Sequence, residues 1–275
     1  MTSMRFIILL FLVCTQAIAQ ETNSSLYSSA SMSKEGKGKF YISFGYNLDW
    51  YTPSDIHFKN NKGDNYDFTL YDVKSKDYPG IKDIFHQNIS IPQYSYRLGY
   101  YFSKHPDWAV EINYDHTKYI AIQDQTVRLK GQIHDVWYDT DTVLHRDFIQ
   151  YEHTNGANYF MLNAVRRFSL LHSPNTKHWL SAIAKVGAGP VVPRSDTYIF
   201  NNRRNEIYHI AGYVTGIDLG FRYDFLRRFH IETSGKFAYA NYSRVFLYGD
   251  GNARQHWFSF EYIFTLGYQF DALIF

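Results

Sequence analysis

The chain has 275 residues, carries 28 Lys and Arg against 26 Asp and Glu, and is 19% aromatic. This near-neutral charge argues against nucleic acid as a partner, because nucleic acid requires a basic face. The only cysteine, Cys14, lies in an N-terminal segment that we expect to be removed, which excludes disulfides, zinc-thiolate sites and cysteine nucleophiles from the mature chain.

Residues 1–19 have the pattern of a cleaved signal peptide. They contain one positive charge, Arg5, then an apolar run and the small-x-small sequence from Ala17 to Ala19. The alternative is a lipoprotein signal in which Cys14 would carry the lipid, but the preceding residue is valine and not a small one. Residues 20–38 are rich in Ser, Lys and Gly, and we predict a flexible periplasmic leader there.

Eight segments from Phe40 onward alternate between apolar and polar residues. This period of two is typical of strands, because a helix would spread such a pattern around its whole surface. In "HWFSFEYIFTLGYQF", residues 256–270, one face consists of aromatic residues and leucine, and the other is mostly polar. The apolar faces of the other seven segments run over Phe40–Leu48, Tyr94–Phe102, Trp108–Tyr114, a weakly alternating stretch Phe148–Leu171 with Phe160 and Leu162 outward, Leu180–Val186, Tyr213–Phe225 and Phe229–Tyr239.

The connections between these segments alternate in length. Those after the second, fourth and sixth segments are short, whereas those after the first and third are long. Short turns at one end and long loops at the other are the layout of a bacterial outer-membrane barrel. The first long connection contains "DIHF" and "NYDFTLYDV", which we expect to pair as a hairpin above the membrane. If that hairpin entered the membrane, the barrel would have ten strands.

The volume of the barrel decides which face points inward. The interior of an eight-stranded barrel is just wide enough to be filled by side chains, so it could not hold the aromatic faces of several strands. This argues against a soluble barrel of lipocalin type. We therefore predict an all-β fold over residues 39–275, an eight-stranded antiparallel up-and-down transmembrane β-barrel with aromatic residues toward lipid.

The chain resembles the small outer-membrane β-barrel proteins of Gram-negative bacteria, the OmpA/OmpX/OmpW-like class. The resemblance covers about 230 residues and includes the C-terminal assembly signal of that class, an alternating aromatic strand with a glycine and a terminal aromatic, which Gly267, Tyr268, Phe270 and Phe275 match loosely. "DALI" interrupts the alternation before Phe275. The resemblance implies a location in the outer membrane of a diderm bacterium and insertion by the barrel-assembly machinery.

Nine charged residues on the polar faces are predicted to point into the barrel lumen. Buried charges must pair or keep water, so we expect a network of salt bridges that plugs the barrel. The alternative is a gated ion path or proton relay through the same residues. They are Arg97, Glu111, Asp115, Lys185, Asp218, Arg222, Glu232, Lys236 and Glu261.

The stretch "YEHTNGANY", residues 151–159, is the one place that suggests an enzyme. Outer-membrane phospholipase A and the lipid A deacylases carry a His-x-Ser-Asn pattern in which histidine deprotonates the serine. Here Asn155 stands where that serine would follow His153, so no catalytic role is transferred. We interpret the two residues as a polar strand top.

No metal site and no cofactor are predicted. The histidines lack the spacing of a zinc site, and the acidic stretch with Asp135, Asp139, Asp141 and Asp147 lacks the glycine-containing spacing of a calcium loop. We interpret that stretch as a solvated loop, with a weak cation site as the alternative.

The function predicted from the sequence is structural or loop-mediated binding by an outer-membrane barrel. The partners expected are outer-membrane lipid, lipopolysaccharide and an extracellular ligand for the aromatic residues of the long loops. Two alternatives stay open, a narrow ion channel and a lipid-modifying enzyme.

Overall fold

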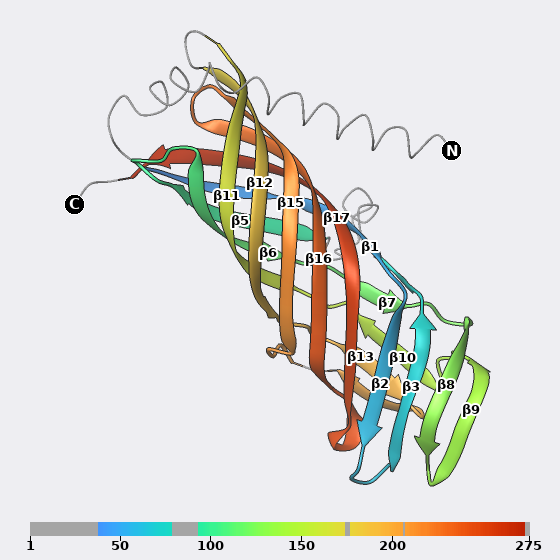
Figure 1. The fold of residues 1–275 in the computed structure, drawn as a ribbon. Coiled ribbons are helices and arrows are strands. Elements are labelled where there is room, and N and C mark those ends of the chain that lie inside the picture. Colours follow the sequence, from blue (N-terminus) through green and yellow to red (C-terminus); the bar gives the residue numbers. More distant parts are fainter. Residues whose placement is uncertain (1–37, 79–92, 174–176, 206, 273–275) are drawn as a thin grey trace, which may run out of the picture.

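Eight antiparallel strands form a closed ring in the computed structural model, which describes residues 38–78, 93–173, 177–205 and 207–272. Each strand pairs with the next, and the last returns to pair along the whole of the first (Figure 1). The fold class predicted from the alternation is therefore confirmed. In ring order the strands are β1 (Lys39–Tyr51), β5 (Tyr94–Tyr101), β6 (Trp108–Asp115), β11 (Tyr159–His172), β12 (His178–Val191), β15 (Gly212–Phe225), β16 (Phe229–Phe246) and β17 (Asn252–Asp271).

The two faces of the ring have opposite chemistry. Alternate side chains of each strand point outward and are large and apolar, as at Phe44, Leu98 and Phe264, whereas their neighbours in sequence are buried inside. Glycine and serine recur on the inner face, where space is short; a Cβ on Gly45 would lie 1.8 Å from the carbonyl oxygen of Phe264. The side chains thus follow the orientation expected from the volume argument.

The fourth predicted segment, residues 148–171, is divided between two sheets. Its first part is β10 (Ile149–His153), which lies outside the ring, and only β11 belongs to the barrel. The prediction of one strand over this range was wrong because the backbone turns between them, with positive φ angles at Gly156 and Asn158. Phe160 and Leu162 do point outward from β11.

The hairpin expected in the first long connection is confirmed, but it adds no strand to the ring. Strands β2 (Ser54–Asn60) and β3 (Tyr66–Val73) pair with each other, and β2 pairs with the first residues of β17, beyond the point where β1 leaves that strand. The ring is closed by β1 and β17, so the ten-stranded alternative is excluded.

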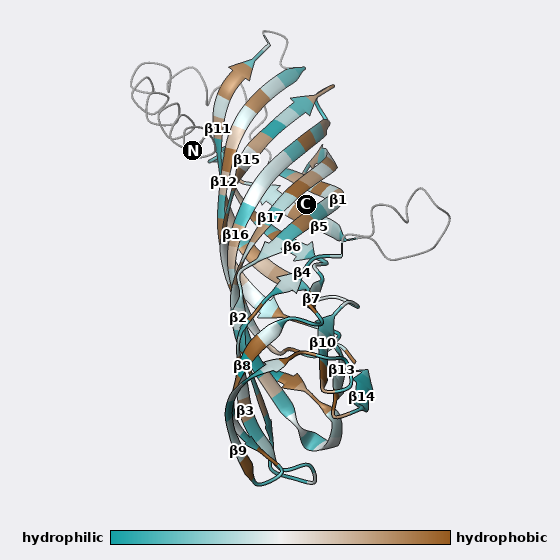
Figure 2. Ribbon diagram, turned by 90° about the vertical axis from the view of Figure 1, so that its right-hand side faces the viewer, coloured by the Kyte–Doolittle hydropathy of each residue, from teal (hydrophilic) through white to brown (hydrophobic). Residues whose placement is uncertain are grey.

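A second, outer part extends the barrel at the end of the long connections. One of its sheets continues from β17 through β2 and β3 to β8 (Thr126–Ile133) and β9 (Val136–Val143). The other has the order β14 (Asn202–Asn205), β13 (Asp196–Ile199), β10, β7 (Tyr119–Ala121) and β4 (Ser75–Lys76). Figure 2 shows the two sheets as facing layers below the barrel. A short 3-10 turn, η1 (Tyr248–Asp250), joins β16 to β17.

An apolar core fills the space between the two outer sheets. Phe58, Phe68 and Leu70 enter it from β2 and β3, and Ile149 and Ile199 from the opposite sheet. Burial of such side chains stabilises a fold by roughly 1.5–3 kcal/mol each. The outer part is therefore a packed sandwich and not a set of solvated loops. The acidic stretch, which the sequence predicts as a solvated loop, is exposed as expected, but residues 136–143 of it form β9.

The predicted signal peptide, residues 1–19, and the leader as far as residue 37 lie outside the described residues, as does Phe275 at the other end. Among the residues that are described, no helix is long and apolar enough to cross a membrane.

Candidate functional site: the barrel lumen and its outer cap

Asp115 is a carboxylate of the lumen at which two cations meet. Its Oδ1 accepts hydrogen bonds from Arg97 Nη1 at 2.6 Å and from Ser95 Oγ at 2.7 Å. Its Oδ2 accepts from Lys236 Nζ and from the Asn113 side chain. All of these groups are buried, so the carboxylate exchanges its water shell for two cations and two neutral donors.

Glu111 is the second carboxylate at which cations meet. Lys185 Nζ lies 3.0 and 2.9 Å from its two oxygens, and Arg97 Nε lies 3.7 Å from the first. The Tyr41 hydroxyl donates to it at 2.7 Å. Lys185 also donates to Glu232 at 2.6 Å, which links β12 to β6 and β16.

These pairs join into one chain of charges across the lumen. Lys236 lies between Asp115 and Glu261, at 3.5 Å from the latter, so acid and base alternate from one end of the chain to the other. Strands β6 and β16 are not neighbours in the ring, and the chain therefore spans its interior. In order, its members are Glu232, Lys185, Glu111, Arg97, Asp115, Lys236 and Glu261.

The two remaining residues of the predicted set are buried beside this chain. Asp218 is in register with Lys185 on one side and Lys236 on the other, and its Oδ1 has no hydrogen-bond partner within the described ranges. Arg222 donates to Asp224 at 2.9 Å and to Gln269 at 3.1 Å. The structure thus places all nine residues in the interior and seven of them in one continuous chain.

Other charged residues of the interior were not predicted from the sequence, among them Asp49, Asp224 and Arg167. The Arg167 guanidinium lies 3.3 Å from Asp224 and 4.4 Å from the centre of the Tyr101 ring. Asp224 has the same parity as Asp218 and Arg222, and that signal was sufficient to find it. Arg167 lies on β11, where the alternation is too weak to assign a face.

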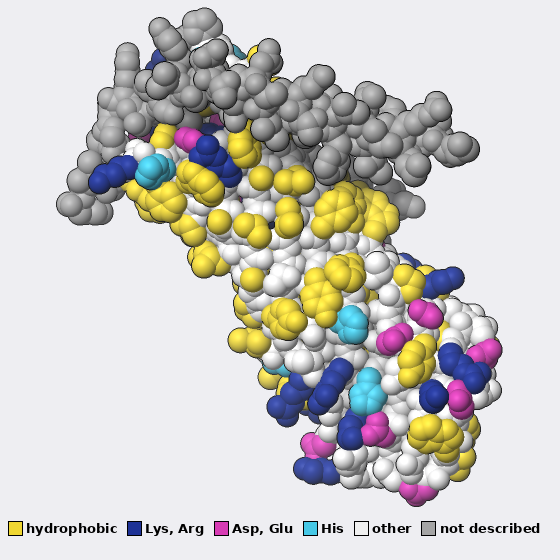
Figure 3. Space-filling view, viewed as in Figure 1, with side chains coloured by type: hydrophobic (Ala, Val, Ile, Leu, Met, Phe, Trp, Pro, Cys, Tyr) yellow, Lys and Arg dark blue, Asp and Glu magenta, His cyan; other side chains and the backbone are white. Residues whose placement is uncertain are grey.

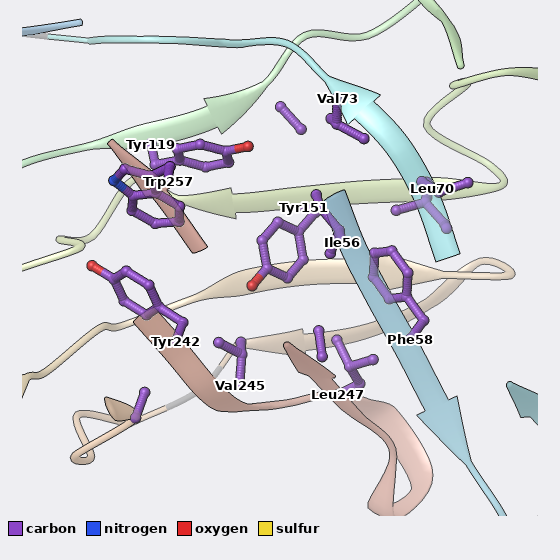
Figure 4. Packing of buried hydrophobic residues seen from close by; sticks show 14 of the residues in the cluster. Ile56, Phe58, Leu70, Val73, Tyr119, Tyr151, Tyr242, Val245, Leu247 and Trp257 are labelled. Atoms are coloured by element: carbon purple, nitrogen blue, oxygen red, sulfur yellow. The ribbon is translucent and has the colours of Figure 1, made fainter. Parts of the chain in front are cut away.

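An aromatic layer covers the lumen at the outer end. Trp257 stacks on Tyr119 at 4.4 Å and on Tyr242 at 4.5 Å between ring centres (Figure 4). Its indole donates to the Tyr159 hydroxyl at 2.9 Å, which in turn lies 3.3 Å from Ser259 Oγ. The next inward side chain of β17 after Ser259 is Glu261, which belongs to the ion-paired chain. The aromatic layer therefore lies next to that chain.

His153, the last residue of β10, lies buried in this layer. Its ring stacks on Tyr242 at 5.1 Å, and its Nδ1 shares a hydrogen bond of 2.7 Å with Ser195 Oγ. Both residues are fully buried, which is the environment of a core pair and not of a nucleophile that must meet a substrate. Asn155 lies apart from it in the turn before β11, where its carbonyl accepts a hydrogen bond from Tyr208.

The buried imidazole predicts a pH dependence of stability. Burial, with a smaller contribution from His209, lowers the pKa of His153 to about 3. Between pH 6.5 and that value His153 is protonated in the unfolded chain but not in the folded one. The free energy of unfolding is therefore highest above pH 6.5 and falls on acidification. Replacing the pair, in His153→Phe with Ser195→Ala, should reduce the loss between pH 6.5 and 4.5 by about 2–3 kcal/mol.

Urea unfolding at the two pH values, followed by near-ultraviolet circular dichroism, measures this difference. His105→Phe, at an exposed turn of the barrel, is the control and should leave the pH dependence unchanged. Equal losses in the double variant and the unmodified protein would contradict the assignment.

Three acidic residues of the stretch 134–147 have side-chain partners in the outer part. Arg128 lies 2.7 Å from Asp139 and 3.3 Å from Asp141, and the Asp135 carboxylate accepts a hydrogen bond from the Asn65 amide at 2.7 Å. Their positions on and beside β9 place them on the surface of the sandwich. In the part of the chain that the structure describes, no cluster of acidic and histidine side chains has the arrangement of a metal site.

Comparisons with known proteins give similarities of structure only. No protein-family model matches the chain, and no curated protein matches it in sequence. Among solved structures it is similar to Neisserial surface protein A, with 10% identity and a TM-score of 0.33 over 84% of this chain and 97% of that one.

Two further solved structures are similar over comparable lengths. The outer membrane protein OprG of Pseudomonas aeruginosa has 11% identity and a TM-score of 0.37, covering 86% of this chain and 97% of its own. The attachment invasion locus protein Ail of Yersinia pestis, in complex with the heparin analogue sucrose octasulfate, has 13% identity and a TM-score of 0.33, covering 85% and 99%.

Proposed function

We propose that this chain is an outer-membrane β-barrel that holds a rigid binding sandwich outside the cell. The observation that carries the proposal is the band of exposed apolar side chains around a barrel whose interior is charged and buried. In water such a band would be strongly unfavourable, whereas in a bilayer it matches the hydrocarbon. Figure 3 is consistent with this, because patches of hydrophobic side chains run along the visible barrel face, whereas charged ones gather over the outer part and at the far end of the barrel.

The lumen is proposed to be closed to solutes. An alternating chain of acids and bases crosses it, and a stacked aromatic layer lies over the outer end. Small barrels of eight strands are filled by side chains, whereas water-filled channels have many more strands. These features favour a structural and binding role over conduction.

The proposed location in the outer membrane also implies how the chain gets there and which molecules contact it. An export signal would deliver the chain to the periplasm, where the barrel-assembly machinery would insert it. Lipid would then contact the apolar band, and lipopolysaccharide would surround the base of the sandwich. The outer sandwich is the part free to meet a ligand, because the long connections that build it all leave the barrel at one end.

A charge placed on the apolar band tests the membrane location. Leu219, 54% exposed near the middle of β15, should tolerate arginine poorly, with a loss of about 2–4 kcal/mol in lipid vesicles. Val136→Arg is the matched control, because Val136 is 52% exposed but lies on β9 of the sandwich. That change should cost less than about 0.5 kcal/mol.

Refolding into vesicles and urea titration, followed by tryptophan fluorescence, measures both variants. Similar losses in the two would mean that water surrounds both positions alike, and the proposed location would then be wrong. The same conclusion would follow if the processed protein stayed monomeric in buffer without detergent.

A further inference from the structure

A basic cleft lies at the end of the sandwich farthest from the barrel. It has a volume of about 360 Å³, which is within the range of small-molecule sites. Its walls come from the β2–β3 turn, from β14, and from the ends of β16 and β17 with the turn between them. Of the described residues that line it, four are cationic and one, Asp250, is acidic; the cations are Lys59, Lys62, Arg204 and Arg244.

The positive charge of this cleft is only partly compensated. Lys59 is paired with Asp67 at 2.6 Å. Lys62 is 80% exposed and no closer than 4.0 Å to Asp250, which is the limit of an ion pair. Arg244 is exposed, and no carboxylate of the described residues lies within ion-pair distance of it. Positively charged side chains that line one cleft repel each other, so an anionic ligand would bind there favourably.

The walls of the cleft are fastened to one another. The Asn60 side chain donates to the carbonyl of Gly249 at 2.8 Å, which ties β2 to the turn after β16. Arg204 Nη1 donates to the carbonyl of Leu247 at 3.1 Å. The Arg244 guanidinium lies 4.8 Å from the centre of the Phe246 ring. Because these contacts exist before any ligand arrives, little ordering remains to be done on binding.

The polar groups of the cleft specify the chemistry of the ligand. Planar guanidinium groups bind phosphate, sulfate and carboxylate through paired hydrogen bonds. The amides of Asn61 and Asn252 line the same cleft and have no side-chain hydrogen bond within the described ranges, so both can bind hydroxyl groups. We infer that the cleft between the β2–β3 turn, β14 and the β16–β17 turn binds an anionic saccharide, a sugar that carries phosphate, sulfate or carboxylate.

The position of the cleft indicates which molecules of the cell surface could supply such a ligand. In Figure 1 the β2–β3 and β16–β17 turns lie at the opposite end of the molecule from the turns that close the far end of the barrel. This step rests on the proposed function, which puts the barrel in the membrane. The headgroups next to the barrel are then out of reach, and the cleft meets surface polysaccharide.

Titration calorimetry on the full processed chain in detergent tests the inference. The probes are a phosphorylated core oligosaccharide from lipopolysaccharide, a sulfated glycosaminoglycan octasaccharide, a neutral maltooligosaccharide and inorganic phosphate. At least one anionic oligosaccharide should bind, more weakly as salt is raised, and the neutral one should not. Arg244→Gln with Lys62→Gln should weaken binding about tenfold or more, because each charged hydrogen bond is typically worth at least that factor.

Arg146→Gln with Lys74→Gln is the matched control, because both residues are exposed on the outer part but do not line the cleft. It removes the same charge and should change the affinity less than about twofold. The arm that binds identifies the source, lipopolysaccharide or sulfated glycan. Binding of phosphate alone, equal binding of the neutral sugar, or an unchanged affinity in the Arg244 and Lys62 variant would overturn the inference. Its failure would leave the Leu219 test of membrane location untouched.

Discussion

Replacing Asp115 with alanine should lower the free energy of unfolding by about 3–5 kcal/mol, because the buried cations that share its carboxylate keep only their longer contacts, to Glu111 and Glu261. Here two cations lose their common acceptor, Arg97 and Lys236, and both are buried in the lumen. Neither can regain water without opening the barrel. Urea titration in lipid vesicles, followed by tryptophan fluorescence and by heat-modifiable mobility on gels, measures the loss.

Asp141→Ala provides the control for the Asp115 variant. The Asp141 side chain is 69% exposed and lies 3.3 Å from Arg128, so its pair is a surface one and its loss should cost less than about 1 kcal/mol. The same samples can be tested for conductance in planar bilayers, where the unmodified protein should be silent. Equal stability of the Asp115 variant and the unmodified chain, or steady conductance by the latter, would contradict a plug of paired charges.

Replacing Trp257 with alanine should cost about 3–5 kcal/mol, the usual loss for a buried tryptophan. The indole is the centre of the aromatic layer, between Tyr119 and Tyr242, and it donates to Tyr159. Removing it leaves a cavity between the lumen charges and the core of the sandwich. The outer sandwich should therefore unfold at lower urea concentration than before, as measured by far-ultraviolet circular dichroism.

Trp137→Ala is the matched control for the loss of tryptophan. Trp137 is 66% exposed on β9, so its removal should change stability by less than about 0.5 kcal/mol. If the two variants unfolded at the same urea concentration, the aromatic layer would contribute nothing that an exposed ring does not, and its role as a cap would be wrong.

The barrel could be predicted from the sequence because each of its strands carries its own signal. In β17 the outward residues from Phe258 to Phe270 are apolar, and the inward ones other than Ile263 are small or polar. Local alternation is thus enough to assign the faces. It fails at β10, which pairs with β7 and β13 in the other sheet and not with the strands of the ring.

The outer sandwich was missed although part of it carries the same signal. In β8, Val127 and Leu129 alternate with Arg128 and Lys130, and the former are buried. Its neighbour β9 is exposed on both faces, so it has no alternation to detect. Strands as short as β7 and β4 depend on partners distant in sequence, and no local pattern predicts those pairings.

The members of the lumen network could be predicted, but their pairing could not. Parity alone put Glu111, Lys185 and Lys236 inside. Which acid meets which base depends on how strands that are not neighbours approach across the ring, as Asp115 on β6 and Lys236 on β16 do. The basic cleft could not be predicted for the same reason, because Lys62 and Arg244 come together only in the folded sandwich.

The length of β17 has a mechanical consequence. This strand has 20 residues, or roughly 65 Å at the usual rise, whereas about 9–11 residues suffice to cross a bilayer. The same strand is therefore part of both the barrel and the sandwich, and it runs without a break from one to the other. If the barrel lies in the outer membrane as proposed, a sideways force on the far end of the sandwich is transmitted along β17 and tilts the whole barrel, so the bilayer sets the orientation of that end.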